Sequence, residues 1–115
     1  SLIRAKFAEN LAPSFDLTIN AEELFLMGLF SVLDVILEMP MEKALSIVKV
    51  SKPISDALIN GKGKFAKILN FLIQYENGNW QEVSRLMIID KIEMPNVYDA
   101  YINTLNWYKN LFAEI

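Results

Sequence analysis

The sequence contains neither cysteine nor histidine among its 115 residues. The lack of cysteine excludes disulfides, thiolate metal sites and cysteine nucleophiles, and it is typical of proteins from a reducing compartment. The lack of histidine removes the commonest metal ligand and the usual general base near neutral pH. These two absences limit the possible chemistry of the chain more strongly than any motif that it contains.

Positive charge and targeting signals are also scarce. Eleven Lys and Arg stand against fourteen Asp and Glu, a net charge of -3, and the basic residues are scattered apart from a loose cluster at residues 62–67. This distribution argues against a nucleic-acid surface. No basic region followed by an apolar run and a cleavage site is present. We therefore expect a cytoplasmic protein, and the start at SLIRAKF leads us to expect a fragment of a longer one.

Long hydrophobic runs are missing too. The most apolar stretch is LFLMGLFSVLDVIL, which covers fourteen positions from Leu24 to Leu37 and is interrupted by Asp34. A bilayer-spanning helix needs about 20 apolar residues, so no membrane insertion is expected. The pattern instead predicts one buried helix from Ala21 to about Glu38, in which Gly28 permits the close approach of another helix. We expect its central packing to come from Phe30, Leu33 and Leu37.

What the sequence does contain is helical periodicity between clear breaks. Apolar residues make up 53% of the chain, and they recur at the spacing of amphipathic helices. Helices are predicted before Pro13, over 21–38, 41–50, 54–59, 64–76 and 80–89, and from Pro95 onward. The pairs Asn20/Glu23 and Asn79/Glu82 have the spacing of capping boxes. The expected fold is all-α, a compact bundle of six or seven helices that forms one domain over residues 1–115.

The last predicted helix is rich in aromatic residues. Its expected apolar stripe consists of Tyr98, Tyr101, Ile102, Leu105, Tyr108 and Phe112. Such side chains can fill the interior of a small bundle, or they can anchor a protein interface. Because aromatic residues occur on more than one face, we expect some of them at a domain or subunit contact. The candidates for that contact are Tyr98, Tyr101, Trp107 and Phe112.

The order of several short motifs resembles a known family. The segments GLFSVLDVILEMPMEKAL and KPISDALINGKGKFAKILNFLIQYENGNW, preceded by RAKFAENLA and ending in Tyr75-Glu76-x-Gly78-x-Trp80, are similar to the C-terminal part of HDOD domains, the HD-related output domains. The likeness is to the branch fused behind an EAL cyclic-di-GMP phosphodiesterase domain in bacterial signalling proteins. It covers roughly residues 2–90 and becomes more diffuse in the last helix.

The resemblance implies an HD-superfamily-like bundle without the metal site. The His-Asp pair that binds metal in HD phosphohydrolases falls on Ser31 and Val32, which cannot replace it. The implied function is a non-catalytic output or interaction module in cyclic-di-GMP signalling, with no cofactor and no enzymatic activity. Its expected partners are the neighbouring EAL and N-terminal HDOD portions of the same protein. In their absence the exposed surface is expected to form a homodimer.

Two alternatives stay open from the sequence. The chain could be a degenerate metal-dependent phosphohydrolase that uses carboxylates alone, with Asp34 and Glu38 as the least unsuitable ligands. It could also be a helical domain that senses a small ligand in place of the lost metal. In that case Ser31 and Asp34, three residues apart, would form a remnant polar site. Against this stands a simpler interpretation, in which Ser31 hydrogen-bonds to its own helix and Asp34 lies at the rim of the core.

Overall fold

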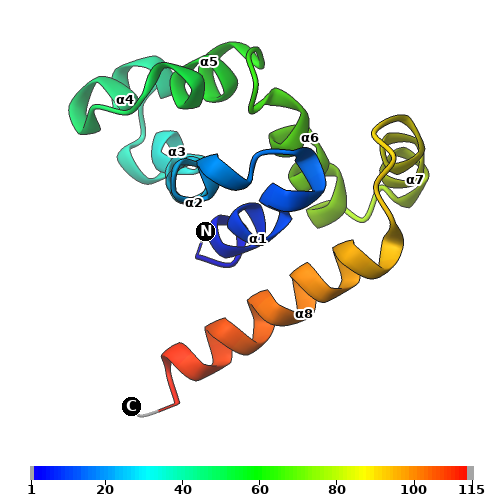
Figure 1. Ribbon diagram of the computed structural model, residues 1–115. Coiled ribbons are helices and arrows are strands. Elements are labelled where there is room, and N and C mark those ends of the chain that lie inside the picture. Colours follow the sequence, from blue (N-terminus) through cyan, green and yellow to red (C-terminus); the bar gives the residue numbers. More distant parts are fainter. Residues whose placement is uncertain (1, 114–115) are drawn as a thin grey trace.

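The computed structural model describes residues 2–113 and confirms the all-α fold, with no strand in this part of the chain (Figure 1). In chain order the elements are α1 (Leu2–Leu11), the 3-10 turns η1 (Ala12–Phe15) and η2 (Thr18–Asn20), α2 (Ala21–Phe30), α3 (Leu33–Leu37), α4 (Met41–Val48), α5 (Lys52–Asn60), α6 (Ala66–Glu76), α7 (Trp80–Ile89) and α8 (Met94–Leu111). If α2 and α3 are counted as one bent helix, the bundle has the seven helices that the sequence allowed.

Helix α1 lies at the centre of the bundle. It contacts α2, α6 and α8, while α4 and α5 pack together at the end of the molecule opposite α8 (Figure 1). The side chains of Phe7 and Leu11 on α1 are buried among residues of the surrounding helices. The predicted core face of α6 is confirmed, because Phe65, Ile68, Leu69 and Leu72 are all buried. A central helix that is apolar on several sides therefore organises the fold.

Gly28 has the role that the sequence predicted. A Cβ atom built on this residue would lie 2.6 Å from the Cα atom of Ala5 and 2.8 Å from its backbone nitrogen. Real Cβ atoms do not come this close to backbone atoms, so any larger residue would force α1 and α2 apart. Glycine has a low helix propensity and so weakens α2 at this position, but its lack of a side chain is what lets α1 and α2 touch.

The predicted single helix over 21–38 is wrong. The structure breaks it at Ser31 and Val32, and the second part, α3, has only five residues and buries none of them. The expectation that Phe30, Leu33 and Leu37 form the central packing is wrong for the same reason: none of the three is buried, and Leu37 is 36% exposed. The buried residues of this stretch are Leu24, Met27 and Gly28, all in α2.

The core face of α8 also differs from the prediction. Its buried residues are Val97, Ala100 and Thr104, and the expected stripe of larger residues lies beside this face. Small side chains at the contact let α8 approach α1 closely. Most of the aromatic side chains are consequently left at the edge of the interface or in solvent.

Helix ends are set more by backbone geometry than by the predicted caps. Gly61 closes α5 in the left-handed conformation with a φ of 63°, as the sequence indicated. Neither capping box forms: the side chains of Asn20 and Asn79 make no capping hydrogen bond to the backbone of the helices that follow. Asn20 instead donates to the carboxylate of Glu23 at 2.9 Å.

Among residues 2–113 no single helix combines the length and the apolar composition needed to span a membrane. The stretches Thr18–Leu37 and Met41–Val48 meet these requirements only when taken together, and they are bent by 117° relative to each other.

Candidate functional site

The two positions onto which the resemblance to HD phosphohydrolases places the metal-binding pair, Ser31 and Val32, lie at the break between α2 and α3. Ser31 ends α2, and its hydroxyl donates to the carbonyl oxygen of Gly28 at 2.7 Å. Val32 follows with a backbone that is no longer helical. A serine that hydrogen-bonds back to its own helix competes with the next backbone hydrogen bond. This local competition accounts for a helix end at a point where the apolar pattern continues.

Ser31 is also tied to α1 and α6 through Arg4. The Arg4 guanidinium donates from Nη1 to the Ser31 hydroxyl at 2.7 Å. Its Nε and Nη2 donate to the two carboxylate oxygens of Glu76 at 2.6 and 2.8 Å. Two parallel hydrogen bonds to one carboxylate form the strong, directional pairing that arginine favours. The network links Ser31 at the end of α2 to Arg4 on α1 and, through Arg4, to Glu76 on α6. Arg4 and Glu76 are 72 positions apart in the sequence.

Beside this network is a pocket of about 590 Å³, which we call the aromatic pocket. It lies between α1, α6, the start of α7 and α8, and Val32 forms part of its wall. The lining side chains used below are Arg4, Val32, Tyr75, Glu76, Trp80 and Tyr101. Sequence reasoning missed this site, although the aromatic residues of Tyr75-Glu76-x-Gly78-x-Trp80 were part of the motif that carried the resemblance.

Tyr75 is at the centre of the aromatic cluster. Its ring centroid lies 5.1 Å from Phe7, 5.1 Å from Trp80 and 5.4 Å from Tyr101. These separations and tilted orientations are those of favourable aromatic pairs. Burial, and then the neighbouring Tyr101, raise the pKa of the Tyr75 phenol above its ordinary value. The phenol therefore stays protonated at neutral pH and can donate a hydrogen bond.

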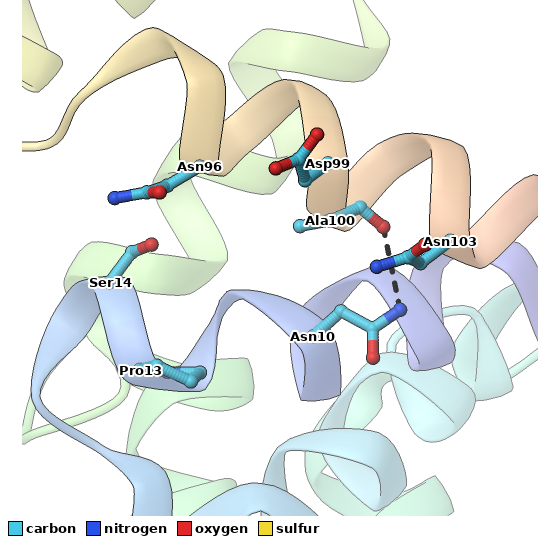
Figure 2. Close-up of a pocket in the computed structure, with 7 residues that line it drawn as sticks. All are labelled: Asn10, Pro13, Ser14, Asn96, Asp99, Ala100 and Asn103. Carbon is cyan, nitrogen blue, oxygen red and sulfur yellow. Dashed lines mark hydrogen bonds between the residues drawn. The ribbon is translucent and has the colours of Figure 1, made fainter.

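A second pocket, of about 350 Å³, is polar (Figure 2). It lies between α8 and the segment from the end of α1 into η1, and Ser14 and Asn96 approach it from opposite sides. The amide nitrogen of Asn10 at its edge already donates to the carbonyl oxygen of Ala100 at 3.4 Å. The polar groups here therefore contribute partly to holding the two helices together.

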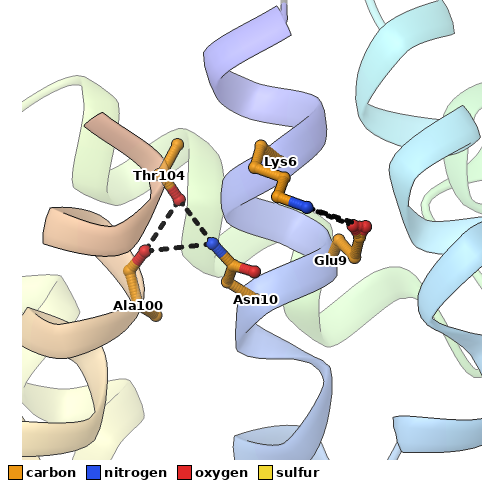
Figure 3. Close-up of polar contacts among 5 residues, drawn as sticks. All are labelled: Lys6, Glu9, Asn10, Ala100 and Thr104. Atoms are coloured by element: carbon orange, nitrogen blue, oxygen red, sulfur yellow. Dashed lines mark hydrogen bonds and ion pairs between the residues drawn. The ribbon is translucent and has the colours of Figure 1, made fainter. Parts of the chain in front are cut away.

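The same Asn10 amide joins α1 to the only buried polar side chain in residues 2–113, that of Thr104 (Figure 3). Asn10 Nδ2 donates to Thr104 Oγ1 at 3.0 Å, and Thr104 Oγ1 donates to the carbonyl oxygen of Ala100 at 2.7 Å. The Lys6–Glu9 ion pair lies on the other side of α1 in this view. This arrangement satisfies every donor that it buries, and so we interpret it as structural.

Asp34 and Glu38, the carboxylates proposed as metal ligands, do not belong to any group of three or more potential ligands within the described residues. Asp34 is half-buried in the first turn of α3, while Glu38 ends that helix with an exposed side chain. Across residues 2–113, no group of three or more acidic side chains has a geometry that could hold a metal ion. The helix is interrupted between Ser31 and Asp34, and the Ser31 hydroxyl accepts a hydrogen bond from Arg4, so the remnant polar site formed by these two residues stays a prediction.

The four predicted interface residues have different environments. Tyr98 and Phe112 are exposed, at 59% and 45%. Tyr101 is half-buried and packs edge-on against Phe7 at 5.2 Å. Trp107 is half-buried too, with Phe25 at 6.2 Å and the Lys6 ammonium 5.3 Å from its ring. Two of the four thus contribute to packing within the bundle, and contact with a partner stays a prediction for all of them.

An exposed apolar surface that sequence reasoning missed lies on α3 and α4. It consists of Val35, Ile36 and Leu37 on α3 and Ile47 on α4, which are 73%, 64%, 36% and 61% exposed. We call these four residues the α3–α4 face; the two helices are in contact. Large exposed apolar residues on two helices in contact make this region a candidate interaction site. No local signal in the sequence reveals it, because α3 is short owing to the break at Ser31 and Val32, where the apolar pattern continues.

Comparisons with known proteins give two curated relatives. The chain is 28% identical over 111 residues to YuxH of Bacillus subtilis, and 25% identical over 111 residues to the cyclic di-GMP phosphodiesterase CdgJ of Vibrio cholerae. Each alignment covers 96% of this chain and 26% of the relative. The chain thus spans about a quarter of the length of the curated relatives that it matches.

No family model and no solved structure matches the chain. The resemblance to HDOD domains itself therefore stays a prediction. The weak similarity to a cyclic di-GMP phosphodiesterase is consistent with the EAL-associated context that the sequence motifs implied.

Proposed function

We propose that the chain is a non-catalytic helical module of a longer cyclic-di-GMP signalling protein. The observation that carries this proposal is the similarity to CdgJ, which extends over 96% of the chain but only 26% of that phosphodiesterase. A segment that matches a small part of a long relative along nearly its whole length has the character of one domain among several.

The chemistry of the break between α2 and α3 supports a role without catalysis. An HD-type metal centre needs imidazole and carboxylate at the position of Ser31 and Val32. The Ser31 hydroxyl is instead engaged by Arg4 and by its own helix, and Val32 has no ligand atom. With no imidazole and no thiol in the sequence, the side chains left to bind transition metals are mainly oxygen ligands, beside the weakly binding thioether of methionine. The module would then act through contacts with other parts of the protein.

The α3–α4 face is the surface that we assign to those contacts. Its proposed occupant is the remainder of the same polypeptide, because the relatives are about four times longer than the part that matches. Covering four large apolar side chains would be favourable by about 25 cal/mol for each Å² removed from water. Tyr98 and Phe112 on α8 stay predicted as additional contacts.

A test of catalysis separates this proposal from the phosphohydrolase alternative. The chain is incubated with Mg²⁺ or Mn²⁺ and cyclic di-GMP, and separately with a generic phosphodiester, and the products are measured by chromatography. We expect no turnover above that of an Asp34→Ala variant, which serves as the matched control. Turnover that the wild-type chain shows and Asp34→Ala lacks would contradict a non-catalytic role and establish carboxylate-dependent hydrolysis.

A further inference from the structure

We propose that the aromatic pocket binds a small planar heteroaromatic molecule. Its ring would stack against Trp80 and Tyr101, and its polar edge would face Arg4 and Glu76. This goes beyond the proposed function, which concerns the α3–α4 face and needs no ligand. It rests on the dimensions of the pocket, the arrangement of its rings and the hydrogen-bonding groups on one side of it.

The size of the pocket suits such a ligand. Pockets that bind small molecules usually enclose about 300–1,000 Å³ and combine apolar walls with a few polar groups. The aromatic pocket has a volume of about 590 Å³, larger than that of the polar pocket beside α8. Its walls come from α1, α6, α7 and α8, so that the site is assembled by packing of the bundle and does not depend on one loop.

The rings leave an aromatic face available. Trp80 stands at 87° to Tyr75 with 5.1 Å between centroids, which fixes the indole by an edge contact. Trp80 nevertheless remains 56% exposed, and within residues 2–113 Tyr75 is the one aromatic ring paired with its indole. A planar ring placed there would gain stacking contact with Trp80 and tilted contact with Tyr101. Stacking of this kind strengthens binding by about 5- to 150-fold for each base in nucleic-acid complexes.

The polar side of the pocket favours a neutral ligand. The charge of Arg4 is already balanced by Glu76, which it contacts through two hydrogen bonds. An anion would have to displace that carboxylate, whereas a neutral heterocycle with adjacent donor and acceptor atoms can approach the pair as it stands. Within the described residues, the Tyr75 and Tyr101 hydroxyls make no hydrogen bond, yet no buried side-chain atom is unsatisfied. Both hydroxyl oxygens therefore keep some exposure to solvent, and neither is engaged by another side chain of the described residues.

The two tryptophans provide a test with a built-in reference. In the ¹⁵N-labelled chain, the indole N–H signals of Trp80 and Trp107 are followed during titration with inosine and adenosine at up to millimolar concentration. Ribose is the matched compound without a ring system. We expect a saturable shift of the Trp80 signal with the nucleosides and none with ribose. Trp107, which packs against Phe25 away from the pocket, should not respond.

Variants then assign the binding to the pocket. Trp80→Ala should weaken nucleoside binding by about 5- to 150-fold, the effect expected from loss of one stacking partner. Trp80→Phe should recover most of it because a ring is retained. Tyr98→Ala is the matched control, since Tyr98 is 59% exposed and lies outside the pocket.

For the variants, binding is followed through the backbone amides of residues 75–80. The proposal is overturned if neither nucleoside gives a saturable shift, if Trp80 and Trp107 respond alike, or if Trp80→Ala binds as tightly as Tyr98→Ala.

Discussion

The two halves of the apolar stretch Leu24–Leu37 have opposite environments. In α2, Leu24 and Met27 are fully buried and Gly28 lies against α1. In α3, Val35 and Ile36 are 73% and 64% exposed, although their side chains are as apolar as the buried ones of α2. Hydrophobicity predicts that such residues will be covered but does not say by what. The first half is covered by this bundle, and we propose that the second half is covered by another part of a longer protein.

Truncation of one residue in each half should give the largest contrast. Leu24→Ala removes a fully buried side chain and should lower the free energy of unfolding by about 2–5 kcal/mol. Ile36→Ala should change it by no more than about 0.5 kcal/mol, since most of that side chain is already in water. Urea denaturation of the isolated chain measures both. Equal losses would show that α3 is part of the core after all.

Gly28→Ala tests the close contact between α2 and α1, which buries the first half of the stretch. Alanine is the better helix former by about 1 kcal/mol, but its Cβ would meet the backbone of Ala5 at 2.6 Å. We expect a net destabilisation of about 2–4 kcal/mol in the same denaturation assay.

Gly61→Ala is the control for Gly28→Ala. Gly61 has open space around it, so its substitution should cost only about 1–2 kcal/mol for the left-handed backbone. A stabilised Gly28→Ala variant would refute the close packing of α1 and α2.

Thr104→Val probes the hydrogen bond between Asn10 on α1 and Thr104 on α8. The change keeps the shape of the side chain but removes the acceptor of Asn10 Nδ2, and we expect a loss of about 1–2 kcal/mol. Ser46 on α4 offers the corresponding exposed hydroxyl, bonded to the carbonyl oxygen of Lys43 at 2.6 Å. Ser46→Ala should be neutral to within about 0.5 kcal/mol. If the two variants behave alike, the link contributes no more than a surface hydrogen bond.

The smallest effect should come from pH. Hydrogen bonds from Asn20, and then from Ser51, lower the pKa of Glu23 below its ordinary value of 4.5. A carboxylate with a lowered pKa in the folded state stabilises that state above its unfolded pKa, and the stabilisation is lost as the pH falls through the folded value. Thermal melts of Glu23→Gln and the wild type should therefore differ by at most about 0.5 kcal/mol at pH 7 and converge in acid. A stability difference between Glu23→Gln and the wild type that grows as the pH falls would contradict this prediction.

Local patterns in the sequence were sufficient for much of the fold. Apolar spacing predicted the buried residues of α6, Gly61 marked the end of α5, and Gly28 indicated a close helix contact. These features depend on neighbours within one or two turns, or on the absence of a side chain. Such information is present in a short window of sequence.

The features that were missed depend on distant residues. Periodicity could not place the break at Ser31, because the apolar pattern continues while the serine hydroxyl is held by its own helix and by Arg4 on α1. The aromatic pocket likewise requires Arg4, Tyr75 and Tyr101 to meet from three helices. On α8, periodicity favoured the larger side chains, whereas close packing selected Ala100 and Thr104. Tertiary contacts of this kind override local preference.

Hydrogen–deuterium exchange over residues 33–48 tests the central claim most directly. The 115-residue chain is compared with the full-length gene product that contains it, at matched concentration and pH. If the α3–α4 face docks against the rest of the polypeptide, these backbone amides should exchange at least about tenfold more slowly in the longer protein, while those of α6 change little. Equal exchange in the two proteins would contradict the account, and so would protection in the isolated chain that rises with its concentration, because a second copy would then cover the face.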